Sequence, residues 1–190
     1  MQIIIHSIPN SSSSELEYSN IVSLLIQHLS KIFGDIASIR SSSQPLRSRT
    51  LPKQLFDKDR EQWISDNVLN WILESNNPDS HTKILAICDF DAYSDNLNFV
   101  FGQAHMGGRV AAIYLPRLRQ EFYVITKSAG NNLFQQRIMK EAVHELGHAF
   151  GLRHCENSKC VMHFSNSLQH TDFKHDKFCE RCNKIVKGIR

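Results

Sequence analysis

Three histidines and a glutamate stand close together in one short stretch, HELGHAFGLRH, over residues 144–154. On an α-helix, residues four positions apart lie on one face, so His144 and His148 can direct a ring nitrogen at a single metal ion. Glu145 follows the first histidine, where its carboxylate can reach a water molecule at that ion without binding the ion itself. The spacing therefore predicts a catalytic metal site with Glu145 as the general base.

The third histidine requires a change of chain direction. An unbroken helix would carry His154 about 15 Å along the axis from His144, which is too far for a shared ion. Gly151 lies between them and can end the helix by entering the left-handed region of backbone conformation. Three imidazoles then leave one position for water, as in a hydrolytic zinc site, although such a set also suits other transition metals. We therefore expect a catalytic zinc held by His144, His148 and His154.

Four of the five cysteines predict a second metal site. They form two close pairs near the end of the chain, Cys155 with Cys160 and Cys179 with Cys182. Four thiolates close a tetrahedral zinc site and leave no place for water, which makes such a site structural. The C-x-x-C pair alone would also fit a redox pair, and one of three histidines could replace a thiolate: His163, His170 or His175. Cys88 lies in an apolar run and is expected to be a buried core residue.

His154 and Cys155 are neighbours that we expect to serve different ions. Adjacent residues outside a helix point in roughly opposite directions, so the two side chains cannot easily bind the same ion. A structural zinc held by Cys155 would fix the backbone that presents His154. The second metal is therefore expected to support the first.

Alternating strands and helices are expected to position these ligands. Apolar periodicity predicts helices over about residues 18–32, 60–74 and 133–150, the last of which carries the HELGH motif. Apolar runs predict strands at residues 3–8, 36–39 and 83–88, and Gly107-Gly108 between two apolar segments predicts a hairpin within residues 97–115. A polar, serine-rich loop is expected over residues 41–50. This order of elements indicates an α/β domain.

Length and composition indicate one globular domain over residues 1–190, with 41% hydrophobic and 22% charged residues. The net charge of +3 is small and the basic residues are scattered, apart from a mild run near the end of the chain. Neither nucleic acid nor a membrane is therefore expected as a partner. No signal peptide or membrane span is recognisable, so we expect a cytoplasmic monomer whose reduced cysteines favour metal over disulfides.

Met162 extends the histidine pattern. A lone methionine is usually core filler, but after H-E-x-x-H-x-x-G-x-x-H a downstream methionine is typical of the metzincin Met-turn, which lies beneath the metal-bound histidines. With the added cysteines, the chain from His144 to Cys182 resembles the archaemetzincin (archaelysin) family, whose pattern is H-E-x-x-H-x-x-G-x-x-H-C-x4-C-x-M followed by C-x-x-C. The preceding segment CDFDAYSDNLNFVFGQAHMGGRVAAIYLPRLRQEFY is also similar to that family, so the resemblance spans at least residues 83–182.

The resemblance implies a compact metzincin-like α/β domain. A twisted mixed sheet and the active-site helix would form an upper part, about residues 1–151, above an irregular, zinc-braced C-terminal subdomain, about residues 152–190. It also implies roles for the motif residues: catalytic zinc ligands at His144, His148 and His154, general base and acid at Glu145, structural zinc ligands at Cys155, Cys160, Cys179 and Cys182, and the Met-turn residue at Met162.

One position departs from the pattern of some metzincins. These have a tyrosine two residues after the Met-turn methionine, where it can touch the zinc and help to stabilise the oxyanion. Phe164 occupies that position here. The role is therefore absent or supplied elsewhere, and His163 is the candidate.

We expect a zinc metallopeptidase with two Zn²⁺ ions that acts on a peptide or protein substrate. The substrate would lie extended along an edge strand, for which one segment of the hairpin within residues 97–115 is the candidate. Aminopeptidase activity is attributed to some members of the resembled family, which leaves exopeptidase or endopeptidase action open.

One alternative is a zinc-stabilised peptide-binding module with little or no turnover, which would have no need of Glu145. A zinc-ribbon nucleic-acid binder is another, but it leaves HELGHAFGLRH unexplained.

Overall fold

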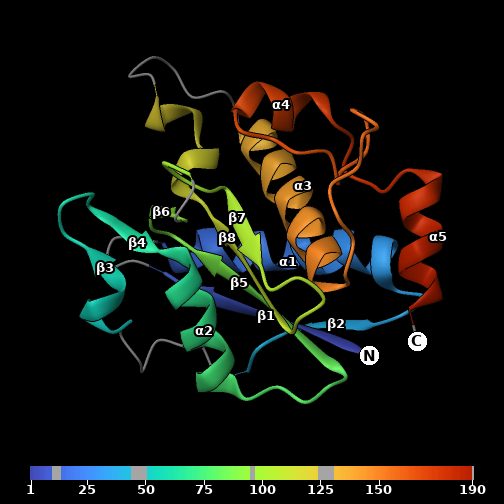
Figure 1. Cartoon of the computed structure of the whole chain (residues 1–190), viewed down its shortest axis with the longest axis horizontal. Coiled ribbons are helices and arrows are strands. Elements are labelled where there is room, and N and C mark those ends of the chain that lie inside the picture. Colours follow the sequence, from blue (N-terminus) through green and yellow to red (C-terminus); the bar gives the residue numbers. More distant parts are fainter. Residues whose placement is uncertain (10–13, 44–50, 95–96, 124–130, 190) are drawn as a thin grey trace.

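A five-stranded sheet forms the centre of the fold (Figure 1). The computed structural model describes residues 1–9, 14–43, 51–94, 97–123 and 131–189. Four strands of the sheet are parallel and one edge strand is antiparallel, in the spatial order β2 (Ser38–Ser41), β1 (Gln2–Ile8), β5 (Thr82–Cys88), β8 (Val110–Tyr114) and β7 (Gly102–Ala104).

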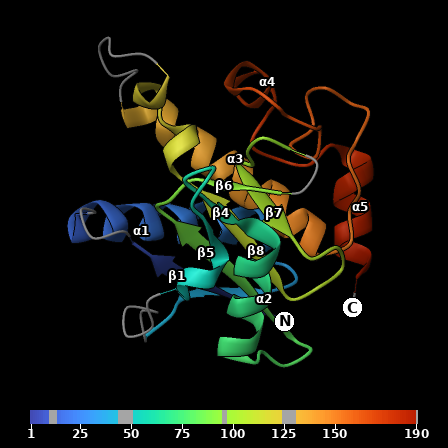
Figure 2. The same cartoon turned by 60° about the vertical axis from the view of Figure 1, so that its left-hand side comes forward.

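Helices cover both faces of this sheet (Figure 2). α1 (Glu15–Phe33) and α3 (Asn131–Ala149) pack on one face, and α2 (Ser65–Asn76) packs on the other. Every residue of β5 is buried as a result, which explains the unbroken apolar run over residues 84–88. α1 connects β1 to β2 and α2 lies between β2 and β5, as parallel neighbouring strands require. The predicted α/β class is confirmed.

The apolar pattern does not reveal a second, three-stranded sheet, which consists of β3 (Phe56–Asp57), β4 (Gln62–Ile64) and β6 (Ala92–Tyr93). The helix predicted from residue 60 begins instead at Ser65, so its predicted start is wrong. Glu61 has a φ of +53°, which a helix does not accommodate, and the next three residues pair in β4. β2 also lies two residues later than predicted, and the expected loop over residues 41–50 falls largely outside the described residues.

The predicted hairpin is present, because β7 and β8 pair antiparallel and Gly107 occupies the turn with a φ of +63°.

The C-terminal segment is more regular than expected, since it contains α4 (Leu168–Phe173) and α5 (Glu180–Gly188). Short 3-10 turns lie at Lys53–Leu55, Pro116–Leu118 and Gln120–Phe122. The division of the chain near residue 151 into two parts stays a prediction. None of the described helices has the length and apolar character needed to cross a membrane.

Candidate active site

The side chains of His144, His148 and His154 converge on one point. The first two come from adjacent turns of α3, and the third comes from the segment that follows it. The Nε2 atom of His148 lies 3.1 Å from that of His144 and 3.3 Å from that of His154. Nitrogen ligands about 2.0–2.1 Å from a tetrahedral zinc lie about 3.3 Å apart, so the three rings fit a zinc ion.

The chain turns back at Gly151, whose φ of +89° lies in the left-handed region. The N–H of Gly151 donates to the carbonyl of His148 at 2.8 Å, and the N–H of Leu152 donates to the carbonyl of Gly147 at 2.9 Å. These bonds satisfy carbonyls in the last turn of α3. The turn returns the chain toward the helix and brings His154 to the other two rings.

Backbone carbonyls orient the two buried histidine rings. Nδ1 of His144 lies 2.7 Å from the carbonyl oxygen of Val161, and Nδ1 of His148 lies 2.7 Å from that of Leu152. A ring nitrogen that donates to a carbonyl carries the proton, which leaves Nε2 free to accept. Burial lowers the pKa of His144 well below its usual value and that of His148 to about 4. Both rings are therefore neutral near pH 7, which is the form that binds metal.

Glu145 lies against the edge strand β7. A Cβ atom at Gly102 would stand 2.5 Å from Cγ of Glu145 and 2.8 Å from its Oε1, so a glycine is needed to leave room for the carboxylate. Burial, with a contribution from the charge of Glu141, raises the pKa of Glu145 well above its usual value. Such a carboxyl group holds a proton readily, which suits a group that must accept and return one. Sequence reasoning missed Gly102 because its partner is remote in the chain.

Met162 packs against α3 between the turns that carry the two buried histidines. A Cβ atom at Gly147 would overlap the sulfur of Met162, so the glycine of HELGH lets the methionine approach the helix backbone. Met162 is fully buried, and its carbonyl accepts a hydrogen bond from the N–H of Cys155 at 2.9 Å. This is the arrangement expected of a Met-turn.

The two residues after Met162 face different surroundings. The ring of Phe164 lies 5.2 Å from the ring of His154, between centroids, and lines the adjacent cavity. Nδ1 of His163 lies 2.9 Å from the carbonyl oxygen of Cys155, and His163 is not among the cavity-lining residues that the structure describes. This placement gives no support to His163 as the oxyanion-stabilising group.

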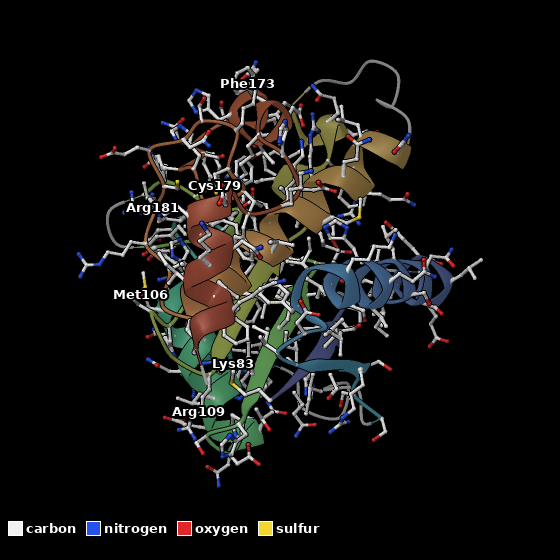
Figure 3. The ribbon with its side chains drawn as sticks, turned by 90° about the vertical axis from the view of Figure 1, so that its right-hand side faces the viewer. Lys83, Met106, Arg109, Phe173, Cys179 and Arg181 are labelled. Atoms are coloured by element: carbon white, nitrogen blue, oxygen red, sulfur yellow. The ribbon has the colours of Figure 1, made fainter. Side chains whose placement is uncertain are left out.

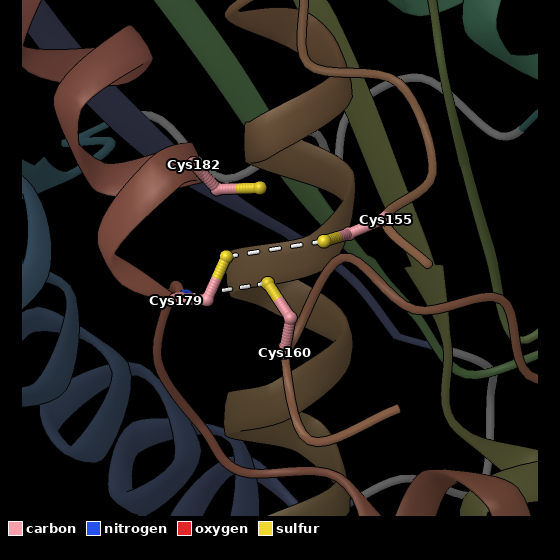
Figure 4. Close-up of side chains that lie close together, drawn as sticks. All are labelled: Cys155, Cys160, Cys179 and Cys182. Atoms are coloured by element: carbon pink, nitrogen blue, oxygen red, sulfur yellow. Dashed lines mark hydrogen bonds between the residues drawn. The ribbon is translucent and has the colours of Figure 1, made fainter. Parts of the chain in front are cut away.

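The four predicted cysteines form a second cluster (Figure 4). Their sulfur atoms lie within 4.8 Å of one another, and those of Cys155 and Cys179 are 3.8 Å apart. Sulfur ligands about 2.3 Å from a tetrahedral zinc lie about 3.8 Å apart, so this set fits a closed zinc site. Within the described part of the chain the cluster contains no histidine, which leaves the four-cysteine set preferred over its variants with His163, His170 or His175.

Cys179 stands at the N-terminal end of α5 (Figure 3). Although burial raises the pKa of its thiol, hydrogen bonds from the backbone of Cys182 and from neighbouring cysteines lower that pKa to about 7. The N–H of Cys179 in turn donates to the sulfur of Cys160 at 3.3 Å. Burial instead raises the pKa of the Cys160 and Cys182 thiols, so Cys179 is the member of the cluster whose thiolate, the form that binds metal, is favoured. Cys88 is buried in β5, as predicted.

Lys83 ties the end of the active-site helix to the β7–β8 hairpin. Its ammonium donates to the carbonyls of Ala149, at 2.9 Å, and Gly108, at 2.6 Å. The N–H of Gly107 also donates to the carbonyl of His148 at 2.9 Å. These bonds fix the distance between the strand edge and the histidine turn. In the sequence Lys83 is only the first residue of a buried strand, so nothing there indicates this role.

A cavity of about 430 Å³ opens beside the histidines. Its walls come from β7, from α3 and from residues 164–166, with apolar side chains at Phe99, Phe101 and Met106. Glu141 and Glu145 face it from successive turns of the helix. The cavity therefore joins a strand edge, the three converging histidines and two carboxyl groups in one space.

Nearly the whole chain matches one known protein family: residues 2–188 fit the model of peptidase family M54. The chain belongs to this family. The archaemetzincin of Methanocaldococcus jannaschii is 37% identical over 163 residues, which cover 86% of this chain and 86% of that protein. The predicted archaemetzincin family and the predicted class of enzyme, a zinc metallopeptidase, are confirmed.

Solved structures of related proteins share the fold. The archaemetzincin of Methanopyrus kandleri superposes with a TM-score of 0.80 at 30% identity, covering 99% of this chain and 94% of that one. A zinc-dependent peptidase from Methanocorpusculum labreanum superposes with a TM-score of 0.81 at 25% identity, covering 97% and 99%. The predicted compact mixed α/β fold is confirmed by these likenesses.

Proposed function

We propose that this chain hydrolyses peptide bonds at a zinc ion held by His144, His148 and His154, with Glu145 as general base and acid. The convergence of the three Nε2 atoms next to the buried carboxyl group of Glu145 carries this proposal. The resemblance to a zinc-dependent peptidase from Methanocorpusculum labreanum supports the choice of metal.

Zinc in this position supplies Lewis acidity toward a carbonyl oxygen and toward water. Glu145 accepts the proton of the attacking water and later donates it to the leaving amine. Its buried position beside Gly102 holds the carboxyl group at the cavity wall throughout. The backbone carbonyls of Val161 and Leu152 keep the histidine rings in one orientation during the reaction.

The free edge of β7 offers a place for the substrate backbone. The carbonyl of Phe101 and the N–H of His105 bond to β8, at 2.8 and 3.0 Å. Because alternate residues of an antiparallel strand direct their backbone groups to opposite sides, Gly102 and Ala104 direct theirs away from β8. Both residues line the cavity. We therefore assign them the role of binding an extended peptide as an added strand.

A second zinc at the four cysteines completes the proposal, with two zinc ions per chain. The His154–Cys155 dipeptide places one side chain in each cluster. A closed zinc site at Cys155 would hold the backbone on which His154 depends, in addition to the hydrogen bond between Cys155 and Met162. The structural zinc would thus stabilise the backbone that presents His154 to the catalytic zinc.

Metal analysis combined with a peptide-library cleavage assay tests the proposal. Wild type is compared with Glu145→Ala and with the control Glu74→Ala, which changes an exposed residue of α2. We expect two zinc ions per chain in all three proteins and cleavage by wild type and the control only. One zinc per chain would refute the two-site arrangement, and equal turnover by Glu145→Ala would remove Glu145 from its role. Two-zinc protein that cleaves no peptide would favour the peptide-binding module.

A further inference from the structure

We infer that Glu141 makes the cavity selective for a cationic group of the peptide, an ammonium or a guanidinium, next to the cleaved bond. This inference rests on the proposed function, because it deepens the substrate recognition of the same cavity. Glu141 precedes Glu145 by one turn of α3, so their Cα atoms stand about 6 Å apart along the helix axis. Both line the cavity.

Of the ion pair between Glu141 and Lys174, only the carboxylate of Glu141 lines the cavity. Oε1 of Glu141 lies 3.2 Å from Nζ of Lys174 and 3.3 Å from the hydroxyl of Thr171. The side chain of Lys174 is fully buried and is not among the described residues that line the cavity, whereas Glu141 lines it. Lys174 therefore supports Glu141 from behind, and an incoming cation approaches the carboxylate rather than the ammonium.

The remaining lining of the cavity is complementary to a cation. The described lining contains no lysine and no arginine, and its carboxyl groups are those of Glu141 and Glu145. Oε1 of Gln103 and the hydroxyl of Ser165 also belong to lining residues, and both atoms are buried without a hydrogen-bond partner among the described residues. The amide of Gln103 donates to Asp66 at 2.6 Å, which leaves Oε1 as an acceptor. The described lining therefore presents carboxyl groups to the cavity but no lysine or arginine.

Other bonds also fasten the chain to the active-site helix at this point. Arg137, also on α3, binds Asp172 through two contacts of 2.7 Å. Lys140 donates to the carbonyls of Thr171 and Asp172 at 3.0 and 2.8 Å. These bonds already fasten α4 to the active-site helix. A further buried ion pair on the cavity side contributes little net stability, because burying its carboxylate costs desolvation free energy. Recognition of a substrate would account for a carboxylate at this position.

The strand direction assigns Glu141 to one side of the cleaved bond. Gly102 lies against Glu145, and farther along the chain Gly107 contacts the carbonyl of His148, so β7 runs in the same direction as α3. A peptide that pairs antiparallel to β7 therefore runs from the His148 side toward the Glu141 side. The residue that follows the cleaved bond then lies nearest Glu141.

A library of peptides randomised at each position tests the inference, with wild type, Glu141→Gln and the control Glu74→Gln compared. Each peptide is supplied with a free and with an acetylated N-terminus. We expect wild type and the control to cleave before lysine or arginine about 10-fold or more in preference to methionine, and Glu141→Gln to lose that preference. A preference that follows the free N-terminus instead would overturn the inference, because the α-amino group of the peptide lies before the cleaved bond. Equal cleavage before lysine and methionine by wild type with either N-terminus, or an unchanged ratio in Glu141→Gln, would overturn the inference.

Two further measurements keep the test independent of folding and of turnover. The double variant Glu141→Met/Lys174→Met replaces the buried pair with apolar side chains of similar size, a change that proteins often tolerate. It should prefer apolar residues after the cleaved bond, and a retained preference for lysine would contradict the inference. Calorimetry measures the binding of lysine- and methionine-containing peptides to Glu145→Ala, which cleaves neither. The affinity for the lysine peptide should be about 10-fold higher. Equal binding there would refute selectivity while leaving the hydrolytic proposal standing.

Discussion

The sulfur of Met162 lies against the backbone of Gly147, in the turn of α3 between the two histidines that face the proposed zinc. No side chain larger than hydrogen fits between them. The same methionine binds Cys155 through its carbonyl. One residue therefore contacts the helix that carries the histidine cluster and the backbone of the cysteine cluster.

Gly147→Ala should destabilise the protein, although alanine normally favours a helix over glycine by about 1 kcal/mol. The added methyl group would overlap Met162, and overpacking of this kind costs about 1–3 kcal/mol. The free energy of unfolding from denaturant titration measures the effect. Combination with Met162→Ala should cost less than the sum of the two single changes, because the methyl group then enters vacated space. Strict additivity would show that the two residues are not in energetic contact.

Gly102→Ala should reduce turnover without loss of zinc. Its methyl group would stand 2.5 Å from Cγ of Glu145 and displace the carboxyl group, while the histidines are untouched. A misplaced general base should lower kcat by about 10²-fold or more. Gly188→Ala is the matched control, because a Cβ atom there meets nothing within 4 Å. Equal kcat values for both variants would show that the contact between Gly102 and Glu145 does not position the carboxyl group.

Cys155→Ser should remove one zinc ion and weaken the binding of the other. Loss of a thiolate opens the four-sulfur site, and the backbone that carries His154 then loses its support. Changes in such supporting interactions lower metal affinity about 10- to 100-fold. Zinc content and competition with a chromophoric chelator measure both effects. Full affinity at the remaining site would mean that the two clusters are independent.

The metal-free protein should lose stability as the pH falls from about 6.5 to about 4. Burial lowers the pKa of His148 to about 4 in the folded state, whereas the unfolded chain has the usual value of about 6.5. Between these values the unfolded state binds more protons, so the free energy of unfolding decreases as the pH falls. The raised pKa of Glu145 acts in the opposite direction, and the Glu145→Gln variant removes it.

Denaturant titration of metal-free Glu145→Gln across this pH range measures the effect. His148→Asn in the same background should make the decrease less steep, while the lowered pKa of His144 still contributes. A stability that rises toward acid would contradict the lowered pKa of His148.

The ligand clusters could be predicted from the sequence because their spacing is local. His144, His148 and Gly151 belong to one helix and its end, and each cysteine pair lies within one turn or loop. Gly102, Glu141 and Lys174 could not be assigned in this way, because their importance depends on contacts between segments distant in the chain. The small sheet was missed for another reason: strands of two or three residues are too short to show a period.

The monomeric state, the cytoplasmic location and the absence of a nucleic-acid partner stay predictions from composition. The helix predicted from residue 60 shows that apolar periodicity predicts the buried face of a helix but not its first residue. Its apolar face at Val68 and Ile72 packs in the core as expected, but a single left-handed residue, Glu61, decides where the helix can begin.

The peptide bond between His154 and Cys155 has a thermodynamic consequence. Two metal sites that share a backbone segment are linked, and linkage is reciprocal. If filling the thiolate cluster raises the affinity of the imidazole cluster by some factor, filling the imidazole cluster must raise the affinity of the thiolate cluster by the same factor. Zinc starvation would then leave fewer singly loaded molecules than two independent sites of the same affinities would leave.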